Sequence, residues 1–163
     1  MNFIYQFKKI IYVLLINNLV FVTLFASPFT DNGNGTITDV YSKLIWQKCS
    51  KGLSGNACKD GASSPEQWES AINYCNSLTL GGIVSGSWRL PNINELYSLV
   101  IVYSNMSIPH IDHAAFPNSN TSGPGYWSST NYSGYAWSVM FNLYNMSYRP
   151  KTEKYYVRCV SGP

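Results

Sequence analysis

The stretch Ser64–Leu78, which reads SPEQWESAINYCNSL, decides the fold of this chain. Ser64 is a suitable N-cap, Pro65 suits the first helical position, and Gln67 completes a capping box three residues after the serine. Apolar residues then follow at helical spacing, namely Trp68, Ala71, Ile72, Cys75 and Leu78. The pattern predicts a helix that begins here and carries Cys75 on its buried face.

Strand-like patterns precede this helix, and a second helical pattern follows it. Residues 29–47 read as a hairpin around the turn Asp31–Gly35. We interpret that run as a turn and not as a calcium loop, because glycines occupy its third and fifth positions and no closing Glu follows. Further along, Asn92 and Glu95 repeat the capping pattern after the extended segment 88–91, which predicts a second helix.

The C-terminal third changes to a period of two. Segments 126–129, 136–141, 146–149 and 155–160 read as short strands joined by Gly/Asn turns. With the two helices inserted into an antiparallel sheet, the pattern predicts an α+β architecture. The stretch 104–125 is rich in Pro, Asn, Ser, Thr and Gly, which predicts a long surface excursion of the kind that often carries function.

The start of the chain has the order of a secretory signal peptide. The first nine residues carry their only charges as Lys8 and Lys9, and an apolar run from Ile10 to Ala26 follows. An uncleaved membrane anchor is the alternative, but two central asparagines are costly in hydrocarbon and the run is shorter than about 20 residues. We therefore predict a signal peptide over residues 1–27 and a single domain over residues 28–163.

The charge balance of the mature chain excludes a strong polyelectrolyte partner. Without Lys8 and Lys9, nine basic residues face eight acidic ones, which leaves a net charge of +1. Binding to nucleic acid is therefore not expected. The low charge and the abundance of Tyr, Trp, Asn, Ser and Gly suit an exported, loop-rich fold, and no stable membrane span is expected after leader removal.

The four cysteines point to disulfide bonds, because an even number in an exported chain is typical of them. Three pairings are possible. Cys49 and Cys58 flank a short Gly/Ser/Asn/Lys loop, which favours a local pair and leaves Cys75 to close a long loop with Cys159. A zinc site is the alternative, but none of the spacings is C-x2-C and both histidines lie far away in sequence. We predict the two bonds 49–58 and 75–159, with no metal site and no cofactor.

Several motifs together resemble one family. They are Ile37–Asp39 with Leu44–Gln47, Trp68–Cys75, Trp88–Asn92 with Glu95–Leu96, Phe116–Asn118, Tyr126–Ser129 and Val157–Val160. In this order they resemble the Lcl C-terminal-domain family, named after the end domain of a collagen-like bacterial surface adhesin. The resemblance covers nearly the whole mature chain, although no Gly-X-Y collagen segment is present.

The resemblance implies a C-type-lectin-like fold in which a cysteine on the first helix is bridged to one on the last strand. The fold expected is thus α+β and C-type-lectin-like, with two helices, a small antiparallel sheet and disulfide bridges. The resemblance also implies an exported location, whether secreted, periplasmic or at the cell surface. For the named adhesin it implies attachment to sulfated glycosaminoglycans and assembly as a trimer, which makes a homo-oligomer an expectation here too.

Candidate catalytic groups are scarce in the sequence. His110 and His113 are the only imidazole bases, and we interpret their loop as a solvated turn capped by Asp112. Gly-x-Ser-x-Gly, His-Glu-x-x-His and phosphate-loop motifs do not occur. We therefore predict no catalytic residues and no enzymatic activity.

Candidate ligand contacts are aromatic and basic. Trp88 and Trp127 head motifs near loops and are the better placed indoles for contact with a sugar, whereas Trp46, Trp68 and Trp137 are assigned to the core. A basic cluster near the C-terminus consists of Arg149, Lys151, Lys154 and Arg158, diluted by Glu153. It suits an anionic polysaccharide, or it is a solvated edge that discourages strand pairing.

These observations predict an exported or surface-associated binding module. The first hypothesis is an adhesin that recognises glycans such as glycosaminoglycans, through the stretch 104–125 and the nearby strand ends. The alternative is a structural protein of the cell envelope that acts through contacts with envelope or host proteins. An exported hydrolase is a distant third.

Overall fold

The computed structural model describes residues 27–101, 110–143 and 145–163. The signal peptide predicted over residues 1–27 lies outside this part except for its last residue, and so do the first residues of the excursion 104–125. Among the described residues, none of the helices has the length and apolar character needed to cross a membrane.

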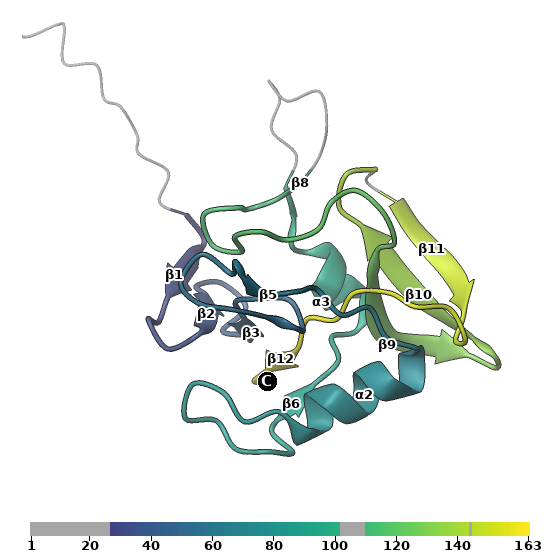
Figure 1. Ribbon diagram of the computed structural model, residues 1–163, viewed down its shortest axis with the longest axis horizontal. Coiled ribbons are helices and arrows are strands. Elements are labelled where there is room, and N and C mark those ends of the chain that lie inside the picture. Colours follow the sequence, from purple (N-terminus) through teal and green to yellow (C-terminus); the bar gives the residue numbers. More distant parts are fainter. Residues whose placement is uncertain (1–26, 102–109, 144) are drawn as a thin grey trace, which may run out of the picture.

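The larger sheet has five antiparallel strands and joins the two ends of the described chain (Figure 1). In spatial order they are β1 (Phe29–Asp31), β2 (Thr36–Asp39), β3 (Ile45–Gln47), β12 (Val160–Ser161) and β6 (Trp88–Arg89). The predicted hairpin is confirmed, since β1 and β2 pair around the Asp31–Gly35 turn and β3 adds to β2. The last strand, β12, therefore lies in the interior of the sheet.

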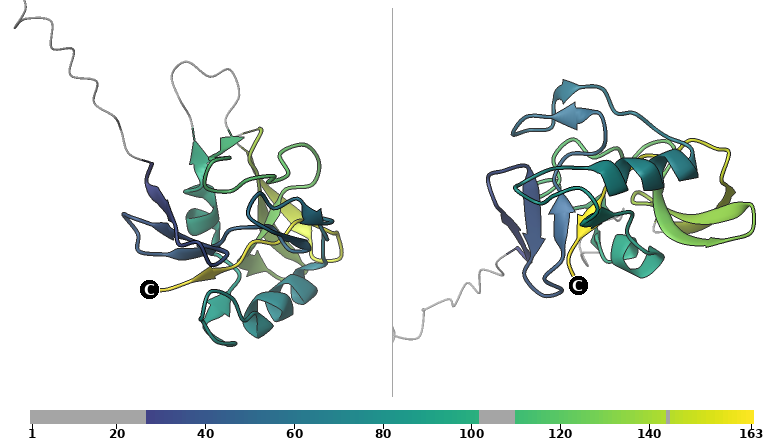
Figure 2. Two further views of the ribbon diagram at one scale, coloured as in Figure 1. Left: turned by 60° about the vertical axis from the view of Figure 1, so that its left-hand side comes forward. Right: turned by 90° about the horizontal axis from the view of Figure 1, so that it is seen from below.

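A second sheet consists of three longer strands and lies at the far end of the molecule from β1 and β2 (Figures 1 and 2). Its strand order is β11 (Asn145–Pro150), β10 (Tyr135–Met140) and β9 (Tyr126–Tyr132). Two small antiparallel pairs complete the strands: β4 (Leu53–Ser54) with β5 (Asp60–Gly61), and β7 (Val100–Ile101) with β8 (His110–Ile111). The predicted strand over 155–160 forms only at its end, as β12.

Helix α2 (Trp68–Ser77) forms where a helix was predicted, but it begins later and without the predicted cap. Its N-cap is Gln67, whose side chain makes no capping hydrogen bond. The preceding Glu66 is extended instead: its backbone N–H donates to the Tyr155 carbonyl at 2.8 Å, and its carbonyl accepts from the Tyr155 N–H at 3.0 Å. The capping box at Ser64 is therefore wrong, because a long-range backbone pair holds this segment.

Helix α3 (Ile93–Tyr97) confirms the second helical prediction in a short form. The Asn92 side chain accepts a hydrogen bond from the Glu95 backbone N–H, and the Glu95 carboxylate accepts one from the Asn92 N–H, which completes a capping box. Arg89 holds the same carboxylate with two hydrogen bonds of 2.7 Å each. Burial acts to raise the pKa of the Glu95 carboxyl, but these donors and the Arg89 charge outweigh it and lower the pKa.

Both predicted disulfide bonds are confirmed, Cys49–Cys58 and Cys75–Cys159. The second bond joins α2 to the segment that enters β12, and both of its cysteines are fully buried. It lies in a core cluster with Trp88, Trp127 and Val157, while a neighbouring cluster gathers around Trp46, Leu96, Phe116, Tyr126 and Val139. The helix face that carries Cys75 is thus buried as the spacing predicted.

The predicted fold class is wrong. Strands dominate the described residues, where β1 to β12 form four sheets, and α2 with ten residues is the only helix of more than two turns there. The structure is therefore mostly β and not a two-helix, C-type-lectin-like α+β fold. The second helix stops at Tyr97, with Ser98 as its C-cap, and the chain then turns into β7. The two- and three-residue strands are too short to show a period in the sequence.

Candidate functional site

The two tryptophans predicted to contact a ligand are core residues. Trp88 and Trp127 are both fully buried. The Trp127 indole N–H donates to the Glu66 carbonyl at 2.8 Å, and its ring packs against Tyr155 with centroids 4.5 Å apart. Neither indole presents a face to the surface, so the prediction of direct ligand contact is corrected for both.

Trp46 is buried as predicted, whereas the two other tryptophans assigned to the core are partly exposed, although Trp68 packs against a core cluster. Trp68 lies at the start of α2 and its N–H donates to the Ser128 carbonyl at 2.8 Å. Trp137 lies on β10 and its ring meets Tyr148 on β11, with centroids 5.3 Å apart. Indole rings are therefore available near the surface, but at other positions than the motifs indicated.

Trp137 belongs to a continuous surface of aromatic side chains on the β10–β11 hairpin. Trp137 and Tyr148 are direct cross-strand partners, and Tyr148 also stacks on Tyr135 with centroids 5.2 Å apart. Tyr135 and Tyr148 remain 46% and 39% exposed, and Met146 on the same strand face is exposed as well. We call the surface formed by Tyr135, Trp137, Met146 and Tyr148 the aromatic face.

The geometry of the aromatic face is set by strand register. Residues that pair directly across an antiparallel sheet share a face, and their neighbours in sequence point to the other face. Ala136 pairs with Arg149 and is buried against the α2 side of the sheet, so Trp137 and Tyr148 point away from α2. The Tyr148 hydroxyl donates to the Tyr132 carbonyl at 2.7 Å, which fixes its ring across the hairpin.

The predicted basic residues lie on the α2 side of the same sheet. The Lys151 ammonium lies over the Trp68 ring, 4.1 Å from its centroid, and donates to the Asn131 side chain at 2.8 Å. Lys154 is exposed and its charge lowers the pKa of the Glu66 carboxyl, although the hydrogen bond from Lys51 is the largest cause of that shift. Arg149 is half-buried on this side. The cluster exists, but carboxylates are interspersed in it.

Arg158 is not part of that cluster, because it is fully buried. Its guanidinium donates to the backbone carbonyls of Gln47 and Lys48 and to the hydroxyls of Ser50 and Ser119. The rings of Phe116 and Tyr126 lie 4.6 and 5.8 Å from the guanidinium carbon. Burial lowers the pKa of the guanidinium. Arg158 therefore clamps the start of the Cys49–Cys58 loop to the core and has no access to a ligand.

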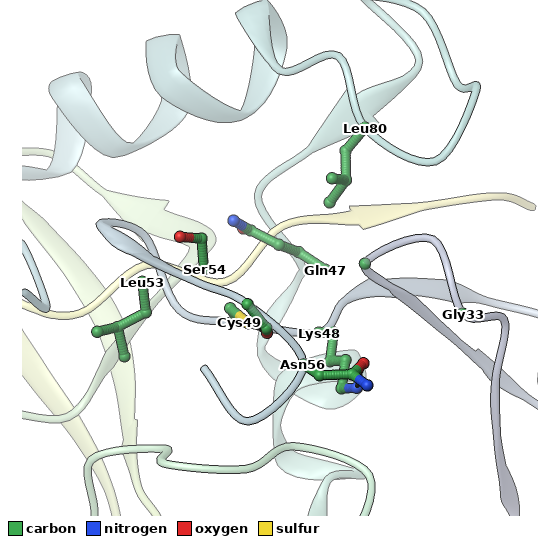
Figure 3. A pocket seen from close by; sticks show the side chains of 10 residues that line it. Gly33, Gln47, Lys48, Cys49, Leu53, Ser54, Asn56 and Leu80 are labelled. Carbon is green, nitrogen blue, oxygen red and sulfur yellow. Dashed lines mark hydrogen bonds between the residues drawn. The ribbon is translucent and has the colours of Figure 1, made fainter. Parts of the chain in front are cut away.

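A pocket of about 290 Å³ opens beside that loop (Figure 3). Its lining comes from three parts of the chain: the β1–β2 turn, the segment from the end of β3 through the Cys49–Cys58 loop, and the loop after α2. The lining residues are Gly33, Gly35, Gln47, Lys48, Cys49, Leu53, Ser54, Gly55, Asn56 and Leu80. Strands β1 to β3, which border the pocket, and the β10–β11 hairpin, which carries the aromatic face, lie at opposite ends of the molecule (Figure 1).

The loop with the two histidines has a structural role in its described part. The Asp112 carboxylate accepts from the backbone N–H groups of Ala114 and Ala115, which confirms the predicted turn cap. His113 is exposed, and residues 102–109 are outside the described part. Across the described ranges, three or more His, Cys, Asp or Glu side chains do not gather in a metal-binding arrangement.

A model of the Lcl C-terminal domain family matches residues 35–161, which is most of the chain. The chain belongs to this family. The resemblance of its motifs is thereby confirmed, and the matched range contains both the aromatic face and the pocket of this Lcl C-terminal domain, apart from Gly33. Its family and its two disulfide bonds indicate an extracellular or surface location. No curated protein and no solved structure shows a significant match to it.

Part of the site left a signal in the sequence. Tyr135 and Trp137 alternate along a recognisable strand, and Tyr148 lies on the next strand of the hairpin, so a cross-strand aromatic pair could have been proposed. The pocket left none, because its lining unites residues 33–35, 47–56 and 80, which only the folded sheet and the Cys49–Cys58 bond bring together.

Proposed function

We propose that this Lcl C-terminal domain is a non-catalytic, surface-associated binding module that holds glycan chains on its aromatic face. The observation that carries the proposal is the continuous contact of Tyr135, Tyr148 and Trp137, whose rings stay open to solvent on one side of the hairpin. Aromatic rings of this kind combine an apolar body with a polar tip. They suit sugar rings, which have apolar C–H faces and hydroxyl edges.

The polar groups on and beside the aromatic face favour a glycan over a purely apolar partner. Each tyrosine carries a hydroxyl that can exchange hydrogen bonds with sugar hydroxyls, and the nearby turn at residues 131–134 adds Asn, Ser and Gly groups. The rings are held by their neighbours, which limits the conformational entropy lost when a ligand orders them. The face is therefore both amphipathic and preorganised.

The basic residues extend the proposal to acidic glycans. Lys151, Lys154 and Arg149 lie around the edge of the same sheet, on the side of α2. A long acidic chain that stacks on the aromatic face and passes over this edge meets their positive charge. Such contacts are weakened by salt because they are exposed to solvent.

A glycan array with the purified, oxidised protein tests the proposal. Trp137→Ala and Tyr148→Ala are each expected to weaken binding about fivefold, because a stacked ring contributes about 1 kcal/mol. Tyr41→Ala is the matched control, since Tyr41 is 82% exposed in the β2–β3 turn and lies outside the aromatic face. Lys151→Met should weaken acidic glycans only, and its effect should shrink as salt is raised.

Two outcomes of the glycan array would contradict the proposal. Unchanged glycan binding in both aromatic variants, or an array without any bound glycan at low salt, would refute it. Capture of envelope proteins that is lost in Trp137→Ala would then favour the structural alternative, in which the aromatic face docks a protein.

A further inference from the structure

The pocket beside the Cys49–Cys58 loop has walls that are set before any ligand arrives. The disulfide bond closes the loop over nine residues of separation, and Arg158 holds the backbone carbonyls where the loop begins. On the opposite wall, Leu80 approaches so closely that a Cβ on Gly35 would lie 3.1 Å from its Cδ1 atom. Gly35 also has a φ of +85°, which favours glycine. The pocket is therefore a built feature of the fold.

One side of the pocket offers hydrogen-bond donors. The Lys48 side chain is only 7% exposed, and its ammonium donates to Asp31 at 2.7 Å and to the Asn56 side-chain oxygen at 3.4 Å. An ammonium has three N–H groups, so one remains for a ligand. The Ser54 hydroxyl and the Asn56 amide nitrogen, both at the exposed rim, make no hydrogen bond to other described residues and add two further donors.

Apolar side chains line two other parts of the pocket. In Figure 3 Leu80 reaches in from the side opposite to Lys48 and Asn56, and Leu53 lies next to Ser54 on the Cys49–Cys58 loop. Gln47 is held in the wall, because one amide N–H donates to the Tyr74 hydroxyl and its oxygen accepts from the Cys159 N–H, which leaves its second amide N–H as a further donor. A ligand must therefore combine an acceptor atom with a small apolar group.

The charge of the pocket selects a neutral acceptor. Asp31 already neutralises Lys48, and the hydrogen bond from Lys48 is the main reason why the pKa of the Asp31 carboxyl is lowered. A sulfate or carboxylate entering here would meet the Asp31 charge at close range. A carbonyl oxygen can accept the remaining Lys48 N–H without that repulsion.

We infer that this pocket binds the acetamido group of an N-acetylated amino sugar. Its carbonyl accepts from Lys48, its methyl group lies against Leu80, and the sugar hydroxyls meet Ser54 and Asn56. The volume of about 290 Å³ is at the lower end of ligand pockets and suits one sugar residue. The inference rests on the proposed function in taking a glycan as the ligand, and it adds a second site and the chemical group recognised there.

Titration of the oxidised protein with N-acetylglucosamine, followed by NMR, tests this inference. Saturable binding in the millimolar range is expected for so small a ligand, and glucose and glucosamine should bind more weakly because they lack the acetyl group. Lys48→Met should weaken binding at least about tenfold, since it removes a charge-assisted hydrogen bond. Lys59→Met is the matched control, because Lys59 is an exposed lysine directly after the Cys49–Cys58 loop and does not line the pocket.

A second variant tests the pocket without altering the Lys48–Asp31 ion pair. Ser54→Phe places a ring at the exposed rim of the pocket and should abolish N-acetylglucosamine binding while the protein keeps its thermal stability. The inference would be overturned if the unmodified protein showed no saturable binding at an N-acetylglucosamine concentration of about ten times the expected millimolar dissociation constant. Unchanged binding in both variants would overturn it as well.

The two proposals fail separately. Loss of array binding in Trp137→Ala without any response to N-acetylglucosamine would remove the pocket inference and keep the aromatic face. Saturable N-acetylglucosamine binding that depends on Lys48, together with array binding that is unchanged in Trp137→Ala, would keep the pocket inference and remove the aromatic face as the glycan site.

Discussion

Removal of each disulfide bond separately gives a sharp test of how this fold is stabilised. In the chain-entropy description, a bond stabilises by restricting the unfolded chain, and the effect grows with the loop it closes. Cys75–Cys159 spans 84 residues of sequence and Cys49–Cys58 spans 9. These separations correspond to about 4.6 and about 2.6 kcal/mol of stabilisation at 25 °C.

The comparison between the two variants is cleaner than either value alone. All four cysteines are buried, so Cys75→Ala/Cys159→Ala and Cys49→Ala/Cys58→Ala lose similar sulfur packing. The difference of about 2 kcal/mol therefore reports mainly the difference in loop length. Urea unfolding of the two variants, followed by tryptophan fluorescence and with the remaining bond verified by mass mapping, measures it.

The reasoning would be refuted if loss of the short bond cost as much as loss of the long one. That outcome would mean that the Cys49–Cys58 loop stabilises the native state through its own contacts, above all those of Arg158, and not through the unfolded chain.

Two further predictions concern buried and paired charges. Arg158→Ala is expected to lower the free energy of unfolding by at least about 3 kcal/mol, because it leaves a cavity and unpaired carbonyls at Gln47 and Lys48; unfolding in urea that matches the unmodified protein would contradict this. The pKa values of Asp31, Glu66 and Glu95 are all lowered in the fold, so their contribution is complete above their unfolded values and is lost as pH falls. The melting temperature should therefore fall progressively below about pH 4.3, and a melting temperature that stays constant from pH 5 to about pH 2 would count against the prediction.

Local signals in the sequence predicted the elements that depend on neighbouring residues. Asn92 and Glu95 form the expected capping box because both partners belong to the same helical turn. The disulfide pairing followed from the short loop between Cys49 and Cys58, which leaves a single choice for the other two cysteines. The family was recognisable from motifs in the right order.

Features that depend on distant residues were not predictable in the same way. Ser64 has the composition of an N-cap, but Tyr155 pairs with the neighbouring Glu66 and keeps the segment extended. Strand alternation shows which residues share a face, but it does not show which face meets the core. For that reason Trp137 was assigned to the core although it is partly exposed. Trp127 was predicted to contact a ligand because its motif lies near a loop, but it is fully buried.

The position of β12 inside the larger sheet sets an order of events for the newly made chain. Synthesis begins at the N-terminus, so Cys49, Cys58 and Cys75 exist before Cys159 does. The Cys49–Cys58 bond can form before Cys159 is made, and Cys75 is then left with Cys159 as its partner. Strands β3 and β6 cannot join through β12 until residues 160 and 161 arrive. Residues 159–161 are therefore needed both for the long disulfide bond and for the larger sheet.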